Sequence, residues 1–188
     1  MHIGCCLLMR LHQLHRTTCL TIYYDLRNDW LYLNWEGNIT LPVLQEACIE
    51  LAQCFQRRPY ARVLNNNEQV TGFNWSIGLW LITNFLPHMT LAGIKQVIWV
   101  PSGTLQGKSM MQMILNLVAG SIITCFDDLA SAVEWMKQTR PQQEHGYLMP
   151  QHTPATQAKL AAVVQDLRLR RAPTAPSRLR QASSVTRK

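Results

Sequence analysis

The chain has 188 residues, of which 47% are hydrophobic and 15% are charged, and its formal net charge at pH 7 is +7. This composition is typical of a globular domain with one sizeable core, and it excludes a chain that is disordered throughout. The most apolar stretch, 77–86, is about half the length of a membrane-spanning helix, so the sequence predicts a soluble protein.

The positive charge is concentrated at the C-terminal end. Residues 1–150 contain ten Lys/Arg and ten Asp/Glu, whereas 151–188 contain eight Lys/Arg and the single acidic residue Asp166. The net charge therefore belongs to the tail, and the rest of the chain shows no basic excess that would indicate a nucleic-acid-binding face.

Cysteine and histidine spacing predicts neither disulfides nor a metal site. The six cysteines form no C-x-x-C pair. His12 and His15 lie three residues apart, as two metal ligands on one helix face would, but no third ligand lies nearby in the sequence. We therefore expect reduced thiols, no metal and no cofactor.

Residues 1–18 are interpreted as an N-terminal extension. Leu7, Leu11 and Leu14 recur at helical spacing, which predicts a short amphipathic helix. No basic segment precedes the apolar patch and no cleavage site follows it, so the expected location is cytoplasmic.

The first elements expected are a β-hairpin and a helix. Residues 19–24 and 30–35 are β-branched and aromatic runs with near-alternating apolar positions. Thr40 and Pro42 indicate a helix start. The apolar stripe of this helix consists of Leu41, Leu44, Cys48, Leu51 and Phe55.

A short strand at 61–64 is followed by the turn-rich residues 65–68 and by a helix at 75–86, capped by Asn74. This helix is apolar around most of its circumference, and no Asp, Glu, Lys or Arg lies between Glu68 and Lys95. Such a helix is either buried or part of an interface.

The pattern continues with a strand at 96–100, a helix at about 106–117, a strand at 121–126 and a helix that begins after Asp127 and Asp128. Alternating strands and helices predict an α/β fold: a single mixed, mostly parallel five-stranded sheet with an N-terminal hairpin and about four helices. The domain is expected at 19–138, and 139–188 as a basic, largely disordered tail with a helix at 157–171.

The order of elements, together with four segments, resembles the SpoIIAA-like branch of the STAS superfamily. The segments are 30–37, 65–68, the A-G-I-K-Q-V run at 92–97, and 121–136 with its F-D-D-L-A-S-A-V-E-W-M motif. The resemblance spans about residues 19–138 and implies a non-enzymatic, cytoplasmic module for regulation or protein interaction. In anti-sigma-factor antagonists of this superfamily, a serine at the start of a helix is phosphorylated, and Ser76 occupies that place here.

The helix at 75–86 is the predicted partner-binding element. Because a helix on a sheet needs only one apolar stripe, Trp75, Ser76, Leu79 and Trp80 are assigned to contacts with a protein partner or a second copy in a homodimer. An apolar-ligand (lipid) carrier is the alternative, by analogy with lipid-transfer domains.

The segment 102–109, S-G-T-L-Q-G-K-S, is similar to a phosphate-binding loop, with Ser102 in place of the first glycine. A nucleotide hydrolase would use Gly107, Lys108 and Ser109 here. The preferred interpretation is a turn that starts a helix.

The basic tail, with Arg168, Arg170 and Arg171, is expected to make at most unspecific contacts with anions.

Overall fold

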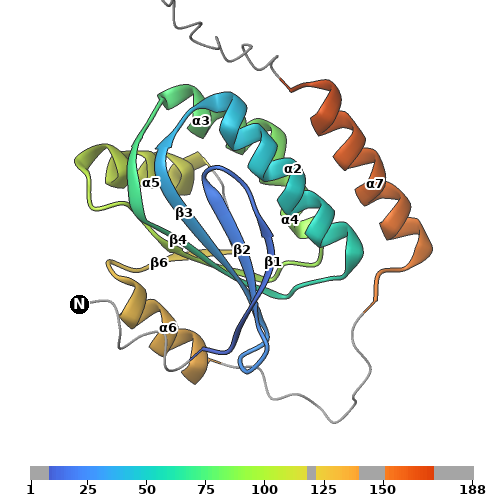
Figure 1. The fold of residues 1–188 in the computed structure, drawn as a ribbon, viewed down its shortest axis with the longest axis horizontal. Helices are drawn as coiled ribbons and strands as arrows, with labels where there is room; N and C mark the ends of the chain where they lie inside the picture. The colour runs from blue at the N-terminus through green and yellow to red at the C-terminus, as the bar shows by residue number, and fades with distance from the viewer. Residues whose placement is uncertain (1–8, 118–121, 140–150, 172–188) are drawn as a thin grey trace, which may run out of the picture.

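A computed structural model describes residues 9–117, 122–139 and 151–171, and these residues form a mixed α/β fold around one six-stranded sheet (Figure 1). The strand order is β1-β2-β3-β4-β5-β6. The strands are β1 (Leu11–Arg16), β2 (Leu20–Asp25), β3 (Trp30–Ile39), β4 (Arg62–Phe73), β5 (Gln96–Val100) and β6 (Ile123–Cys125). The helices are α2 (Leu41–Arg57), α3 (Trp75–Trp80), the π-helix η1 (Leu81–Phe85), α4 (Pro87–Leu91), α5 (Leu105–Leu117), α6 (Leu129–Gln138) and α7 (Pro154–Leu169).

The N-terminal part is antiparallel and the rest of the sheet is parallel. Strands β1, β2 and β3 pair antiparallel, and β3 to β6 pair parallel in sequence order. When each parallel strand is added on the same side of the last one, right-handed crossovers place all connecting helices on one face. Helices α2 to α5 accordingly cover one face, and α6 covers the other (Figure 1).

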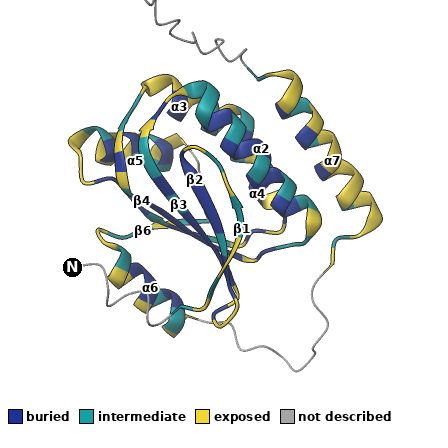
Figure 2. Ribbon diagram, viewed as in Figure 1, coloured by how far each residue is buried: buried dark blue, intermediate teal, exposed yellow. Residues whose placement is uncertain are grey.

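Two apolar clusters fill these layers. The larger one, between the sheet and α2, α3 and α4, includes the fully buried Leu20, Ile22 and Leu31. The smaller one lies beneath α6 and includes Trp30, Leu64 and Met136. Leu31 and Trp30 belong to different clusters because successive residues of a strand point to opposite faces. Most of β2 and the first half of β3 are buried between these layers (Figure 2).

The expected five-strand sheet is wrong by one strand, because residues 11–16 form β1 and not an amphipathic helix. Leu11 packs on the α6 side of the sheet and Leu14 on the α2 side. A spacing of three residues fits one face of a helix, but it also fits a strand that buries leucines on both faces.

The folded unit also extends past residue 138. Helix α7 begins at Pro154 and lies against α2, with Leu160, Val164 and Leu167 buried in the main core. Arg171 forms an ion pair with Glu46 of α2 at 2.8 Å. The expected boundaries, 19–138, are therefore narrower than the unit that the structure describes. Residues 172–188, and with them the rest of the basic tail, lie outside the described residues.

Strand β4 runs through the residues that were expected to form a turn. Asn65, Asn66 and Asn67 all lie within its twelve residues. Asparagine favours turns because its side chain bonds to nearby backbone groups. Here the amides bond to partners distant in sequence, namely Trp35, Tyr32 and Val100, so the local preference is overridden.

The helical segment after Asn74 is longer than predicted and changes its geometry within. It passes through the π-helical turn η1, in which the Leu86 N–H bonds to the Leu81 carbonyl at 2.8 Å, and it continues to Leu91. Proline cannot donate a backbone hydrogen bond and its ring crowds the carbonyl four residues earlier. The wider turn directly before Pro87 lets the helical path continue past it.

Candidate functional site

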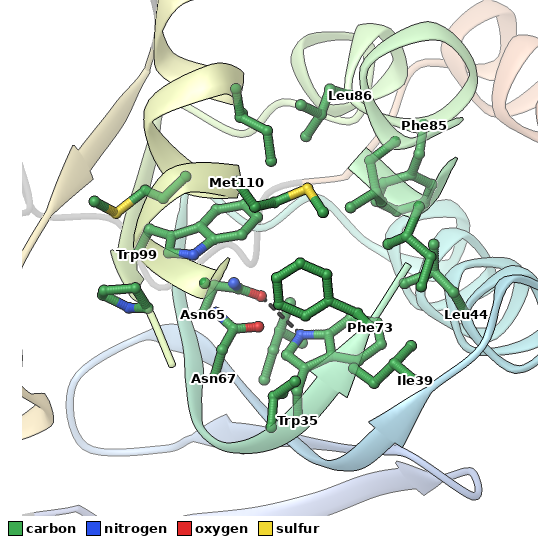
Figure 3. A pocket seen from close by; sticks show the side chains of 18 of the residues that line it. Trp35, Ile39, Leu44, Asn65, Asn67, Phe73, Phe85, Leu86, Trp99 and Met110 are labelled. Atoms are coloured by element: carbon green, nitrogen blue, oxygen red, sulfur yellow. Dashed lines mark hydrogen bonds between the residues drawn. The ribbon is translucent and has the colours of Figure 1, made fainter. Parts of the chain in front are cut away.

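An apolar cavity lies between the sheet and the helices α2, α3, η1, α4 and α5, with a volume of about 90 Å³ (Figure 3). Its lining is aliphatic, aromatic and methionine-rich, and its sheet side carries the polar groups of Asn65, Asn67 and Trp99. A single water needs roughly 10–15 Å³, so the space is larger than packing defects usually are. Apolar cavities with a few convergent polar groups are the usual form of small-molecule sites.

Irregularities in β4 place its side chains in this cavity. Asn34 pairs with Asn66 but Glu36 pairs with Gln69, so β4 contains one residue more than β3 at this point. In a regular strand, Asn67 and Val70 would face opposite sides of the sheet. The bulge changes the alternation, and both residues line the cavity.

Asn65 has an orientation that its neighbour determines. Its Oδ1 accepts a hydrogen bond from the indole Nε1 of Trp35 at 2.8 Å, and both residues are buried. Since an indole nitrogen can only donate, the oxygen must face Trp35 and the amide Nδ2 must face the other way. No described residue accepts a hydrogen bond from this Nδ2.

Asn67 has the opposite arrangement. Its Nδ2 donates to the Val100 carbonyl at 2.9 Å, which leaves Oδ1 without a donor among the described residues. Trp99 pairs with Asn65 across the β4–β5 ladder and lines the same cavity. Figure 3 shows the two amides and the Trp99 indole grouped on the sheet side of the cavity.

The thiol of Cys48 also lines the cavity, and it contributes no charge there. Burial raises its pKa well above the ordinary value, and the neighbouring Cys19 raises it further. Burial likewise raises the pKa of Cys19 to about 11. Both thiols are protonated near neutral pH and behave as small apolar groups.

Part of the helical side of the cavity is formed by Ile77, Leu81, Phe85 and Leu86, which belong to the segment around η1. Side chains of this segment also bond to its own carbonyls: the Thr83 hydroxyl donates to Leu79 O at 2.9 Å and the Asn84 amide donates to Trp80 O at 3.2 Å. These bonds support a π-helical turn, an irregularity frequently found at functional sites.

The tertiary structure also explains why this segment lacks charges. One side faces the cavity, Gly78 faces Met110 of α5, and Phe85 and Met89 lie near Leu160 of α7. A Cβ at Gly78 would lie 2.2 Å from the Met110 sulfur, so α3 and α5 approach closely there. Most of the apolar circumference is therefore covered by the chain itself.

The four residues assigned to partner binding do not share one environment. Trp75 and Leu79 are 49% and 61% exposed, and Ser76 is also exposed. Trp80 is half-buried and packs against the main core. The Ser76 backbone N–H donates to Asn74 Oδ1 at 2.9 Å, as in an ordinary helix cap. Partner binding by these residues, and phosphorylation of Ser76, stay predictions.

The segment 102–109 forms the start of α5. The Gly107 N–H donates to the Thr104 hydroxyl at 3.0 Å, and the Lys108 N–H donates to the Thr104 carbonyl at 3.1 Å. A phosphate cradle needs backbone N–H groups that are free to reach the ligand. These two already have partners, whereas Lys108 and Ser109 are exposed. The geometry supports the helix-start interpretation, and nucleotide binding by this segment stays an untested alternative.

Sequence reasoning did not identify Asn65, Asn67 or Trp99 as site residues. The available signal was three consecutive asparagines directly after an apolar strand segment, which local propensity assigns to a turn.

In the described ranges, no three His, Cys, Asp or Glu side chains are grouped as metal ligands would be. Within the same ranges, no helix combines the length and the apolar character needed to cross a bilayer.

Comparisons with known proteins found a solved structure of low similarity to this chain. No family model matches the sequence, and no curated protein matches it. The structure is similar to the crystal structure of an uncharacterized DUF3478-family protein with a SpoIIAA-like fold from Shewanella loihica PV-4. The TM-score is 0.42 and the identity 15%, and the match covers 68% of this chain and 93% of the other.

Proposed function

We propose that this protein is a non-enzymatic binding module whose cavity holds a small apolar ligand. The observation that carries the proposal is the cavity itself, lined by mostly buried apolar side chains from three strands and the helices above them. This develops the ligand-carrier alternative of the sequence analysis, and it requires no catalytic group.

The energetic cost of an empty cavity supports this proposal. Apolar side chains that line an unfilled space lack the contacts that close packing provides elsewhere in the core. An apolar ligand would restore the missing contacts and recover part of their free energy.

The first test is binding of the neutral fluorescent probe N-phenyl-1-naphthylamine, of which one ring would enter the cavity and the rest would extend beyond it. We expect saturable binding to the wild type and an affinity that is weaker by about tenfold or more in Leu44→Phe. Leu44 lines the cavity, and steric overlap between its replacement and the probe costs about 1–3 kcal/mol. The matched control is Leu167→Phe, at a buried leucine of α7 that does not line the cavity.

Equal probe affinity in the wild type and Leu44→Phe would contradict the proposal, as would the absence of binding to the wild type. Circular dichroism of each variant shows that it is folded before its affinity is compared.

Self-association is a second candidate function, favoured by the exposure of two large apolar side chains one turn apart on α3, Trp75 and Leu79. We propose that this surface contacts a second copy of the chain. Multi-angle light scattering should give a dimer mass for the wild type and a monomer mass for Leu79→Asp. Leu26→Asp, at an exposed leucine in the β2–β3 turn, should leave the dimer intact. A monomeric wild type would disprove this candidate.

A further inference from the structure

We propose that the ligand is uncharged and has a head group with a carbonyl-type acceptor next to a hydrogen-bond donor, as in a carboxamide. This inference rests on the proposed ligand-binding function and extends it to the chemical class of the ligand. It follows from the groups that the cavity leaves unpaired.

The two asparagine amides present opposite hydrogen-bonding groups to the cavity. Asn65 Oδ1 is held by the Trp35 indole at 2.8 Å, so its two N–H donors remain. Asn67 Nδ2 is held by the Val100 carbonyl at 2.9 Å, so its oxygen acceptor remains. Each orientation is determined by a partner that can only donate or only accept, and neither depends on how an amide happened to be placed.

Strand geometry brings these groups together. Asn65 and Asn67 are two residues apart on β4, which separates their Cα atoms by about 6.6 Å in a regular strand. Trp99, paired with Asn65 on the adjacent strand, supplies an indole N–H that no described residue accepts. Figure 3 shows the nitrogen edge of this indole on the side of Asn65. A carbonyl oxygen that accepts from Asn65 and Trp99, beside an N–H that donates to Asn67, satisfies all three.

The lining contains no ionisable side chain other than the protonated thiol of Cys48. The cavity includes no Asp, Glu, Lys, Arg or His. Burying an isolated carboxylate or ammonium without a partner is far more costly than burying a neutral polar group. Ionised fatty acids, amines and phosphates are therefore poor ligands. A neutral amide costs much less free energy to remove from water, and the asparagine side chains replace its hydrogen bonds.

The shape of the site limits the apolar part of the ligand. A volume of 90 Å³ encloses the head group and a few carbons. Leu81, Leu86 and Met111 line the cavity and are half-buried, so part of the lining borders solvent. Met111 is flexible, and with Met110 it can adapt to a ligand body that extends beyond the enclosed space.

The test uses four compounds with the same pentyl body: hexanamide, methyl hexanoate, sodium hexanoate and hexylammonium chloride. Each displaces N-phenyl-1-naphthylamine from the wild-type chain at pH 7.5. Hexanamide should bind about two- to tenfold more tightly than the ester, since the ester lacks the donor for Asn67. Both ions should bind at least tenfold more weakly than hexanamide.

Variants locate the preference at the two asparagines. Asn67→Leu removes the acceptor and keeps the volume, so hexanamide and the ester should then bind with affinities equal within about twofold. Asn34→Leu is the control, because Asn34 is a half-buried amide that bonds to Tyr32 and Asn66 on the opposite face of the sheet. It should retain the amide preference.

The outcomes separate this inference from the function on which it rests. If the probe binds and Leu44→Phe weakens it, but hexanoate or the ester binds as well as the amide, only the head-group assignment is overturned. If neither the probe nor any compound binds, the ligand-binding function fails as well. A preference for the amide that persists in Asn67→Leu also overturns the assignment.

Discussion

Leu167→Ala is expected to lower the free energy of unfolding by about 2–5 kcal/mol, although Leu167 lies in the region that composition assigns to a tail. Its side chain is 1% exposed and belongs to the main core, where α7 packs on α2. Truncation would remove buried methyl groups and leave a cavity between two helices. Urea unfolding followed by circular dichroism measures the difference.

The same helix provides the control for this experiment. Leu169 is two residues further along and 78% exposed, so Leu169→Ala should change the free energy of unfolding by no more than about 0.5 kcal/mol. If Leu167→Ala were as mild as Leu169→Ala, α7 would not belong to the cooperative unit. A large loss at Leu167 alone shows that the domain continues to at least that residue.

Gly107→Ala is expected to destabilise the protein by about 1–2 kcal/mol, even though alanine is the better helix former. A Cβ at this position would lie 2.0 Å from Ser102 Oγ and 3.0 Å from the Ser102 carbonyl oxygen. Overpacking of this kind costs about 1–3 kcal/mol, which exceeds the gain of up to 1 kcal/mol in helix propensity. The glycine of the G-K-S sequence is thus needed for close packing of the chain on itself.

Gly103 is the matched control in the same segment. A Cβ there would meet no atom within 4 Å, so Gly103→Ala should be neutral or slightly stabilising in the same urea experiment.

Titration with Mg-ATP should show no binding to the wild type at millimolar concentration. Saturable binding that Lys108→Ala abolishes would restore the nucleotide-loop hypothesis.

Much of the secondary structure could be predicted because local pattern and tertiary environment agree there. The stripe Leu44, Cys48, Leu51 and Phe55 is buried on α2, as helical periodicity required. Strand β5 has the predicted bounds, Gln96–Val100. Asp128 caps α6 by accepting the Ser131 N–H at 2.8 Å, and this bond lowers the pKa of its carboxyl.

The errors occur where long-range contacts outweigh local preference. The asparagines of β4 would form a turn in isolation, but in the sheet their amides find partners on β3 and β5. The sequence of α7 does not by itself indicate a buried helix, and its burial is favourable only because α2 offers an apolar surface to pack against. Strand β1 exists because the exposed edge of β2 pairs with it.

Apolar periodicity along this chain was enough to establish an α/β fold with an N-terminal hairpin, because burial of one face imposes a period of 2 or 3.6 on each element. The cavity could not be derived in this way. Its volume is a small difference between the space that three strands and their covering helices enclose and the side chains that fill it. Its polarity depends on which end of each amide is already bonded, and those partners, Trp35 and Val100, lie about thirty residues away in the chain.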